Sequence, residues 1–360
     1  MAVDERAGVR VYKAQPGRVL FGTGAADRLA GELDRLGATR AVVIAGKARA
    51  DETVERLAPR VVATMTEIAQ HVPVALAVRA RRLAASVRAD VLVAVGGGSA
   101  IGLAKAVALE SGVPIVAVPT TYSGSELTTI YGLTEGGAKR TGHDQRVLPA
   151  VVVYDPALTV GLPASVTGPS GMNSLAHGVE ALYGPSANPL TCALAEAGIR
   201  ALAAGLPVAV EDPADLAGRT ESLRGAWLAG AALAGAGTGF HHQICHALGG
   251  AFGLDHGGMH AVVLPYAVGF VTPAVPGEMA RVAACLGTAD AATGCWELAR
   301  SLGTPASLAE LGLAEADLER AAELCAGRVA QHPRPSTVAD LLALLRAAYA
   351  GRVPEQDSMR

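Results

Sequence analysis

The chain has 360 residues, 51% of them hydrophobic, which is enough to bury a large core and to form two domains. Its net charge of −3 supplies no basic field for nucleic acid, and no run of about eighteen apolar residues predicts a membrane span. The five cysteines form no Cys-x-x-Cys pair, and dispersed thiols of odd number are typical of a reducing compartment. We therefore expect a cytoplasmic protein that binds neither nucleic acid nor a membrane.

The first half of the chain alternates short β-branched runs with amphipathic stretches. Four of the runs are apolar throughout, which is typical of parallel strands buried on both faces. Amphipathic segments such as 79–88 complete βαβ units. We predict an α/β dinucleotide-binding domain with a parallel sheet over residues 1–155. The four predicted strands are 41–45, 91–95, 115–118 and 151–154.

Two polar loops follow neighbouring predicted strands. The first, 96–99, is rich in glycine and opens a helix, where the backbone N–H groups and the helix dipole favour a pyrophosphate. The second, 119–126, offers hydroxyl groups, and the two loops together predict a nucleotide crevice. The alternatives are a tight strand-to-helix turn and a capping box of Ser123 with Glu126. The predicted cofactor-binding residues are Gly46, Lys47, Gly96, Gly97, Gly98, Ser99, Thr120, Thr121 and Ser125.

The residues after the strand 41–45 bear on the choice of coenzyme. Many nucleotide-binding folds place an acidic residue there for the adenosine ribose, but this chain has Gly46-Lys47-Ala48-Arg49. No carboxylate repels a 2′-phosphate at this point, so we expect NADPH as well as NADH to bind. The alternative is that both basic side chains face water at the start of a helix.

The second half is rich in alanine and leucine and nearly lacks β-branched runs. Prolines interrupt it at plausible helix lengths, so we predict an all-α catalytic domain over residues 156–360. The change of architecture near residue 155 is where we expect a cleft that holds the functional site. The predicted helical stretches are 173–184, 189–205, 219–248, 260–271, 278–287, 292–302, 315–329 and 337–350.

Five of the nine histidines lie within twenty residues of this helical half: His241, His242, His246, His256 and His260. If residues 238–248 are helical, His242 and His246 lie one turn apart on the same face, and His256 comes from the loop after Gly249-Gly250. Imidazole is a ligand for divalent metals and the commonest general acid near neutral pH. The alternative is that one or two of these histidines only pack or cap a helix.

These motifs, in this order, resemble the iron-containing alcohol dehydrogenase family and, within it, the maleylacetate reductases. The loops at 96–105 and 119–126 are similar to the nucleotide loops of the family. The segments 170–183 and 241–250 are similar to its two metal-ligand helices. The resemblance runs from Phe21 to Tyr349 and implies the dehydroquinate synthase-like fold of this family, with a parallel-sheet domain followed by a helical domain.

Asn173 departs from the pattern of the metal-dependent members, which carry aspartate at this position. The resemblance implies a ligand set of Asn173, His177, His242 and His256 if a metal is present. A neutral amide attracts a hard cation less than a carboxylate does, although three imidazoles can still hold Zn²⁺. The maleylacetate reductases resemble this chain in that asparagine and work without a required metal. We therefore expect that no metal, zinc or iron, is required.

The resemblance implies NAD(P)H-dependent reduction of maleylacetate, or a related enone diacid, to 3-oxoadipate by hydride transfer in the interdomain cleft. Addition of hydride to the conjugated alkene develops an enolate, which donor side chains can stabilise. We hypothesise that His242 and His246 hold and protonate the enolate, while His177 and His256 donate to the substrate carboxylates. Further predicted substrate contacts are Tyr122, Asn173 and His241.

Positive charge for a dicarboxylate is expected from the loop 139–143 together with Arg146, although this loop could equally be a solvated turn. Two other functions stay open: a metal-dependent dehydrogenase of another alcohol or aldehyde, and a non-redox lyase or cyclase on the same fold. The resemblance also implies a homodimer. A strand at residues 9–13 could pair across it or be a simple N-terminal strand.

Overall fold

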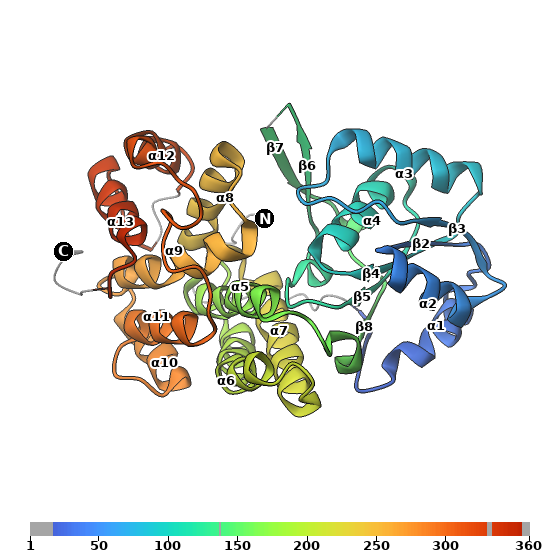
Figure 1. Ribbon diagram of the computed structural model, residues 1–360, viewed down its shortest axis with the longest axis horizontal. Helices are drawn as coiled ribbons and strands as arrows, with labels where there is room; N and C mark the ends of the chain where they lie inside the picture. Colours follow the sequence, from blue (N-terminus) through green and yellow to red (C-terminus); the bar gives the residue numbers. More distant parts are fainter. Residues whose placement is uncertain (1–16, 137, 330–332, 355–360) are drawn as a thin grey trace, which may run out of the picture. The chain divides into compact units, whose positions relative to one another are not determined.

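The computed structural model describes residues 17–136, 138–329 and 333–354, so the predicted strand at 9–13 lies outside the described residues. The chain forms two compact units, one within residues 14–161 and the other mainly within residues 162–360. Figure 1 shows a sheet with flanking helices in the first unit and helices alone in the second. This is the predicted fold class, an α/β domain followed by an all-α domain.

The first unit is built on a six-stranded sheet with the order β1-β8-β5-β4-β2-β3, in which every paired neighbour is parallel. The four predicted strands are confirmed as β2, β4, β5 and β8, and they form the centre. The two edge strands, β1 and β3, are shorter or half-exposed, and the sequence pattern did not reveal them. The strands are β1 (Val19–Phe21), β2 (Ala41–Ala45), β3 (Val61–Met65), β4 (Val91–Gly96), β5 (Ile115–Pro119) and β8 (Val151–Tyr154).

Helices cover both faces of this sheet (Figure 1). On one face, Leu33 and Leu57 from two of the helices join a buried cluster with alternate strand residues such as Val93 and Val116. Because residues of a strand alternate between faces, the intervening residues pack on the other side. The helices are α1 (Leu29–Leu36) and α2 (Lys47–Leu57) on the first face, and α3 (Val74–Ser86) and α4 (Gly98–Ser111) on the second.

Residues 130–143 form an antiparallel hairpin of β6 (Ile130–Glu135) and β7 (Ala138–His143). The prediction of a loop at 139–143 is therefore wrong, because these residues pair with β6 along their whole length. Charged and polar side chains on a two-stranded ribbon gave no hydrophobic alternation from which a strand could be recognised. Short 3₁₀ turns complete the unit: η1 (Ala25–Arg28), η2 (Ser125–Leu127), η3 (Gln145–Val147) and η4 (Pro156–Thr159).

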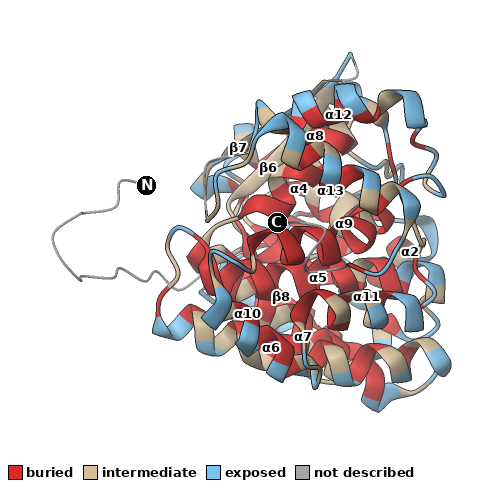
Figure 2. Ribbon diagram, turned by 90° about the vertical axis from the view of Figure 1, so that its left-hand side faces the viewer, coloured by how far each residue is buried: buried red, intermediate tan, exposed pale blue. Residues whose placement is uncertain are grey.

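The second unit is helical, and α9 (His256–Val271) lies at its centre. Every residue of α9 from Gly258 onward is buried, which is typical of a helix surrounded by others. Figure 2 shows the buried residues concentrated on the inner helices of this unit. The remaining helices are α5 (Ala164–Tyr183), α6 (Pro189–Glu211), α7 (Leu216–Ala236), α8 (Phe240–Phe252), α10 (Pro276–Leu286), α11 (Ala291–Ser301), α12 (Leu318–Ala326) and α13 (Val338–Ala350), with the 3₁₀ turn η5 (Glu315–Asp317).

Several predicted helix boundaries in this unit are wrong, and α5 and α6 extend beyond the predicted 173–184 and 189–205. The stretch predicted as one helix at 219–248 is two, because Gly237 takes a left-handed φ of 85° and α8 starts anew after Gly239. Conversely, Gly249 and Gly250 do not end α8, which runs on to Phe252. His256 is consequently the first residue of α9 and not part of a glycine-rich loop.

Helix α6 is the one helix of the described residues that is long and apolar enough to cross a membrane. It packs against α5, α7 and α10, and 44% of its apolar window is buried within the protein. The core helix of a folded helical unit meets the same criteria of length and composition, so α6 is weak evidence for a membrane.

Glycine allows α6 and α7 to pack closely. A Cβ atom at Gly205 would lie 2.6 Å from the backbone nitrogen of Ser222, whereas one at Gly277 would meet nothing within 4 Å. We expect Gly205→Ala to lower the free energy of unfolding by about 1–3 kcal/mol through overpacking. The same change at Gly277 should raise it by up to about 1 kcal/mol through the lost flexibility of the unfolded chain. Denaturant titration of both variants measures this, and equal effects would contradict the packing argument.

Candidate active site

Six histidines from three helices of the second unit form one cluster. His177 comes from α5; His241, His242 and His246 from α8; and His256 and His260 from α9. The rings of His177 and His242 are stacked with centroids 5.1 Å apart, and the ring of His260 lies 4.8 Å from that of His242 and 4.4 Å from that of His256. His246 lies one helical turn from His242, with ring centroids 6.1 Å apart. The four predicted catalytic residues thus belong to one continuous group of rings.

Glu180, on α5, organises this cluster and was given no role by the sequence analysis. Its carboxylate is fully buried and accepts a hydrogen bond from Nδ1 of His242 at 2.6 Å. It also accepts the backbone N–H groups of Gly239 and His242 at 2.9 and 3.1 Å, and so caps the N-terminus of α8. The sequence feature that could have indicated this role is a glutamate three residues after His177 on an otherwise apolar helix.

Burial keeps the inner imidazoles neutral. Burial, with the nearby His242 as a second cause, lowers the pKa of His241 to about 4. Burial, reinforced by His246, lowers the pKa of His242 to about 3. Burial also holds the pKa values of His177 and His260 well below the ordinary range. Because Nδ1–H of neutral His242 donates a hydrogen bond to the carboxylate of Glu180, the lone pair of the ring lies on Nε2. There it can accept a proton or bind a metal.

The predicted substrate contacts do not all lie in this cluster. Asn173 lies on α5 one turn before His177 and is 4% exposed, and His241 is fully buried with its ring centroid 5.2 Å from that of His242. Its Nε2 donates to the carbonyl oxygen of His260 at 3.1 Å. Tyr122 belongs to the first unit, where its side chain is fully buried. The role of all three as substrate contacts stays a prediction.

The predicted nucleotide loops meet at the carboxyl ends of β4 and β5. Gly96 has a left-handed φ of 152°, and α4 begins at Gly98 with no side chain capping it. A Cβ atom at Gly97 would lie 2.9 Å from Oγ1 of Thr121, so only glycine lets the two loops approach this closely. The open helix N-terminus beside hydroxyl groups is the arrangement that binds a pyrophosphate at the end of a parallel sheet.

The other predicted nucleotide residues surround this point. Ser99 lies in the first turn of α4, Thr120 donates its N–H to the carbonyl of Gly96 at 3.1 Å, and Ser125 begins η2. Gly46 and Lys47 lie at the end of β2, the neighbour of β4 in the sheet. Lys47 forms a 2.8 Å ion pair with Asp51, and both side chains are exposed.

One interpretation of the second loop is corrected. The capping box of Ser123 with Glu126 is not formed, because Gly124 precedes η2 with no side-chain cap. Glu126 is instead buried and accepts a 2.7 Å hydrogen bond from the hydroxyl of Tyr154. Lys105 is also buried, and its ammonium group donates to the carbonyls of Thr128 and Ile130 at 2.7 and 2.8 Å.

The positive charges predicted for substrate binding lie around the hairpin of the first unit. Arg140 is an exposed residue of β7, and Arg146 follows the hairpin in η3. The guanidinium group of Arg146 is paired with Asp144 at 2.7 Å, and this pairing lowers the pKa of Asp144 to about 2. Its charge is thus already balanced by a neighbouring carboxylate.

A parallel α/β nucleotide unit followed by a helical unit with clustered histidines defines a class of nicotinamide-dependent oxidoreductases. Comparison with known families agrees: the iron-containing alcohol dehydrogenase model matches residues 16–156, and the C-terminal model of the same family matches residues 167–349. The chain belongs to the iron-containing alcohol dehydrogenase family. It is an oxidoreductase of a family that uses NAD(P)H.

Among its relatives, the chain is 44% identical to a maleylacetate reductase of Burkholderia cepacia over 96% of this chain and 99% of the relative. It is 48% identical to maleylacetate reductase 2 of Cupriavidus pinatubonensis over 94% and 96%. The crystal structure of maleylacetate reductase from Agrobacterium tumefaciens is 39% identical, with a TM-score of 0.92 over 96% of this chain and all of that one. The fold and the subfamily resemblance inferred from the sequence are therefore confirmed.

Proposed function

We propose that this enzyme reduces the carbon–carbon double bond of maleylacetate, or of a closely related enone diacid, with NADH or NADPH. The support is the full-length similarity to proteins named maleylacetate reductases, at 42–48% identity, together with Asn173 where a carboxylate ligand would strengthen a metal site. A conjugated enone accepts hydride at the alkene carbon, and the charge develops on an enolate that hydrogen-bond donors can hold.

The reduction adds one hydride and one proton across the double bond. The hydride leaves the nicotinamide and adds to the alkene carbon β to the ketone, which gives the enolate. A proton then adds to the α carbon, which gives 3-oxoadipate and oxidised coenzyme. His246 is the better placed proton donor, because it is half-buried whereas His242 is almost fully buried. Neutral His242 donates its Nδ1–H to Glu180, which leaves the lone pair on Nε2 as an acceptor in the proposed relay of a replacement proton to His246.

The family name implies an iron ion, and the residues present fit a divalent ion through imidazoles only. Nδ1 of His177 is buried without a hydrogen-bond partner, and the Nδ1 bond of His242 to Glu180 leaves Nε2 as a donor atom. His177, His242 and His256 would hold the ion, with the amide of Asn173 as a neutral neighbour. When bound, the ion would act as a Lewis acid toward the ketone oxygen. We propose that reduction of the enone does not require it.

Three further features of the protein are proposed on the same basis. Lys47 at the end of β2 favours use of NADPH as well as NADH, and the carboxylate of Asp51, 2.8 Å from its ammonium group, balances part of its charge. A homodimer and a cytoplasmic location without nucleic acid or membrane partners are the expectations that accompany this function.

One assay tests the proposed function. Protein treated with a chelator, with its metal content measured, is mixed with maleylacetate and either coenzyme, and nicotinamide oxidation is followed before and after addition of Zn²⁺ or Fe²⁺. We expect turnover without metal and less than a tenfold difference in kcat/KM between the coenzymes. Turnover only after metal addition would contradict metal independence. Oxidation with simple aldehydes but not maleylacetate would favour the alternative alcohol dehydrogenase.

A further inference from the structure

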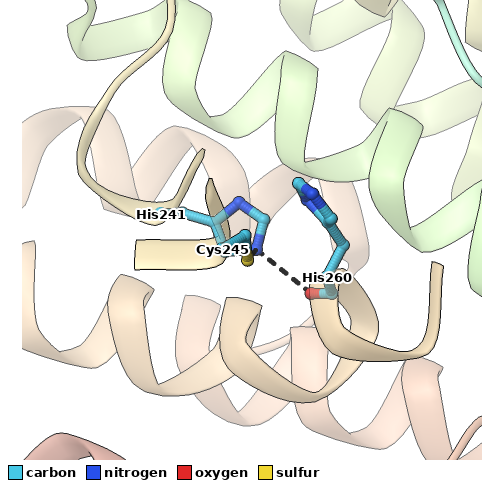
Figure 3. A group of neighbouring side chains, drawn as sticks. All are labelled: His241, Cys245 and His260. Carbon is cyan, nitrogen blue, oxygen red and sulfur yellow. Dashed lines mark hydrogen bonds between the residues drawn. The ribbon is translucent and has the colours of Figure 1, made fainter. Parts of the chain in front are cut away.

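Three buried side chains at one side of the histidine cluster have donor atoms suited to a metal ion. His241 and Cys245 lie one turn apart on α8, and His260 faces them from α9 (Figure 3). All three are 0% exposed, and one donor atom from each lies within 4.8 Å of the others. None of the three belongs to the ligand set that the family resemblance implies.

The hydrogen bonding of this group is incomplete, which points to a missing ligand. Both ring nitrogens of His260 and the Nδ1 atom of His241 are buried without a hydrogen-bond partner. A buried polar atom left unpaired costs about 1–3 kcal/mol, so three such atoms within one small group are unusual. The Sγ atom of Cys245 lies 3.5 Å from Nε2 of His241, so the thiol completes a set of three soft or borderline donors. Metal binding through this Nε2 atom would replace its hydrogen bond to the carbonyl oxygen of His260 and move the ring proton to the unpaired Nδ1 atom.

We propose that His241, Cys245 and His260 form a zinc site that links α8 to α9. One thiolate and two imidazoles suit Zn²⁺, whereas Mg²⁺ and Ca²⁺ prefer oxygen ligands. Zinc–ligand bonds of about 2.0 to 2.3 Å place tetrahedral donor atoms about 3.4 to 3.6 Å apart. The donor atoms here lie within 4.8 Å of one another, so small ring rotations need to shorten these separations by about 1 Å.

Proton and charge balance are satisfied by groups already present. Zn²⁺ displaces the proton of the Cys245 thiol, which leaves to solvent, and the sulfur–zinc bond forms without any change of oxidation state. The remaining positive charge faces the carboxylate of Glu180, which forms a second close group with His241 and His242. Zinc, thiolate and carboxylate together are neutral, as a fully buried cluster requires.

Cobalt substitution distinguishes this site from the histidine site of the family. Co²⁺ bound by a thiolate gives a near-ultraviolet charge-transfer band, whereas Co²⁺ bound only by imidazole and amide ligands gives none. We expect purified metal-free protein to take up Co²⁺ with this band and Zn²⁺ to displace it. Cys245→Ser should abolish the band and weaken zinc binding more than about tenfold, and His260→Gln should weaken both. Cys295→Ser, another fully buried thiol, on α11, is the matched control and should leave the band unchanged.

The cobalt spectra test the proposed zinc site without any measurement of enzyme activity. Absence of the band in wild-type protein, with or without bound cobalt, would overturn it, as would a band that persists in Cys245→Ser. If Cys245→Ser fails to fold, the wild-type spectrum and the His260→Gln variant still give the answer. The proposal is independent of the reduction reaction, so a failed activity assay with a positive cobalt band would leave the zinc site standing.

Discussion

His242→Ala should lower kcat for reduction of maleylacetate by about 10²- to 10⁴-fold, the range expected when a general acid–base group is lost. His242 lies between the rings of His177, His246 and His260, so its removal interrupts the proposed proton path at its centre. Because the coenzyme loops lie in the first unit, KM for NAD(P)H should change little. Single-turnover oxidation of the nicotinamide measures this change.

The control for this variant is Glu297→Ala. Glu297 is an exposed residue of α11 in the second unit and should be replaceable without loss of kcat. His242→Ala also leaves the buried carboxylate of Glu180 with one partner fewer, so circular dichroism should confirm that the variant is folded. A folded variant that keeps the wild-type rate would reject His242 as a catalytic residue.

Glu180→Gln should lower kcat by about 10²- to 10⁴-fold while the protein stays folded. The amide oxygen of glutamine can still accept the backbone N–H of His242, which bonds to Oε1 of Glu180, whereas the N–H of Gly239, which shares Oε2 with Nδ1 of His242, loses its acceptor. The NH₂ group of glutamine, however, would donate toward Nδ1 of His242 and force the ring proton onto Nε2. The Nε2 lone pair that the proposed proton relay uses would then be lost, so Glu180 acts as a positioning residue.

The pH profile separates this role from a purely structural one. Loss of the correct tautomer should reduce kcat and alter its pH dependence, with little change in KM. Glu180→Ala should in addition destabilise the protein by about 3–5 kcal/mol, because it removes the acceptor for buried donors. Glu211→Gln, at an exposed glutamate of α6, is the control. If Glu180→Gln were fully active, the proposed orientation of His242 would be wrong.

The elements of the fold that could be predicted from the sequence are those with a regular hydrophobic pattern. The central strands were recognised because every residue of runs such as 91–95 is apolar, and buried parallel strands have that composition. The edge strand β1 has only three half-buried residues, and the hairpin strand β7 is polar, so neither stands out. The break between α7 and α8 was missed because Gly237 stands among glycine and alanine residues that are equally common within these helices.

The candidate site was predicted in part for a similar reason. The spacing of His242 and His246 on one helix face is visible in the sequence, and so is the density of histidines around them. Glu180 is 62 residues away from His242 in the chain, and no local pattern joins a carboxylate on one helix to the N-terminus of another. The unpaired nitrogens of His260 are likewise a property of packing and not of sequence.

The buried histidine cluster also sets a limit on the acidity that the metal-free protein can tolerate. His177, His241, His242 and His260 all have folded-state pKa values below the ordinary 6.5 of an unfolded chain. Above pH 6.5 these groups are neutral in both states and cost nothing. As the pH falls below 6.5, the unfolded chain binds protons that the folded chain cannot, so the free energy of unfolding decreases.

Each of the four groups contributes up to about 1.4 kcal/mol per pH unit, or up to about 5.6 kcal/mol per unit together, between pH 6 and the folded-state values. A typical stability of 5–15 kcal/mol is exhausted within about one to three such units. Denaturant titrations from pH 7 to pH 5 should show this slope, and His260→Gln should reduce it by about a quarter. A stability independent of pH over this range would contradict it. The residues proposed to carry out the chemistry therefore also fix how acidic a compartment this enzyme can survive.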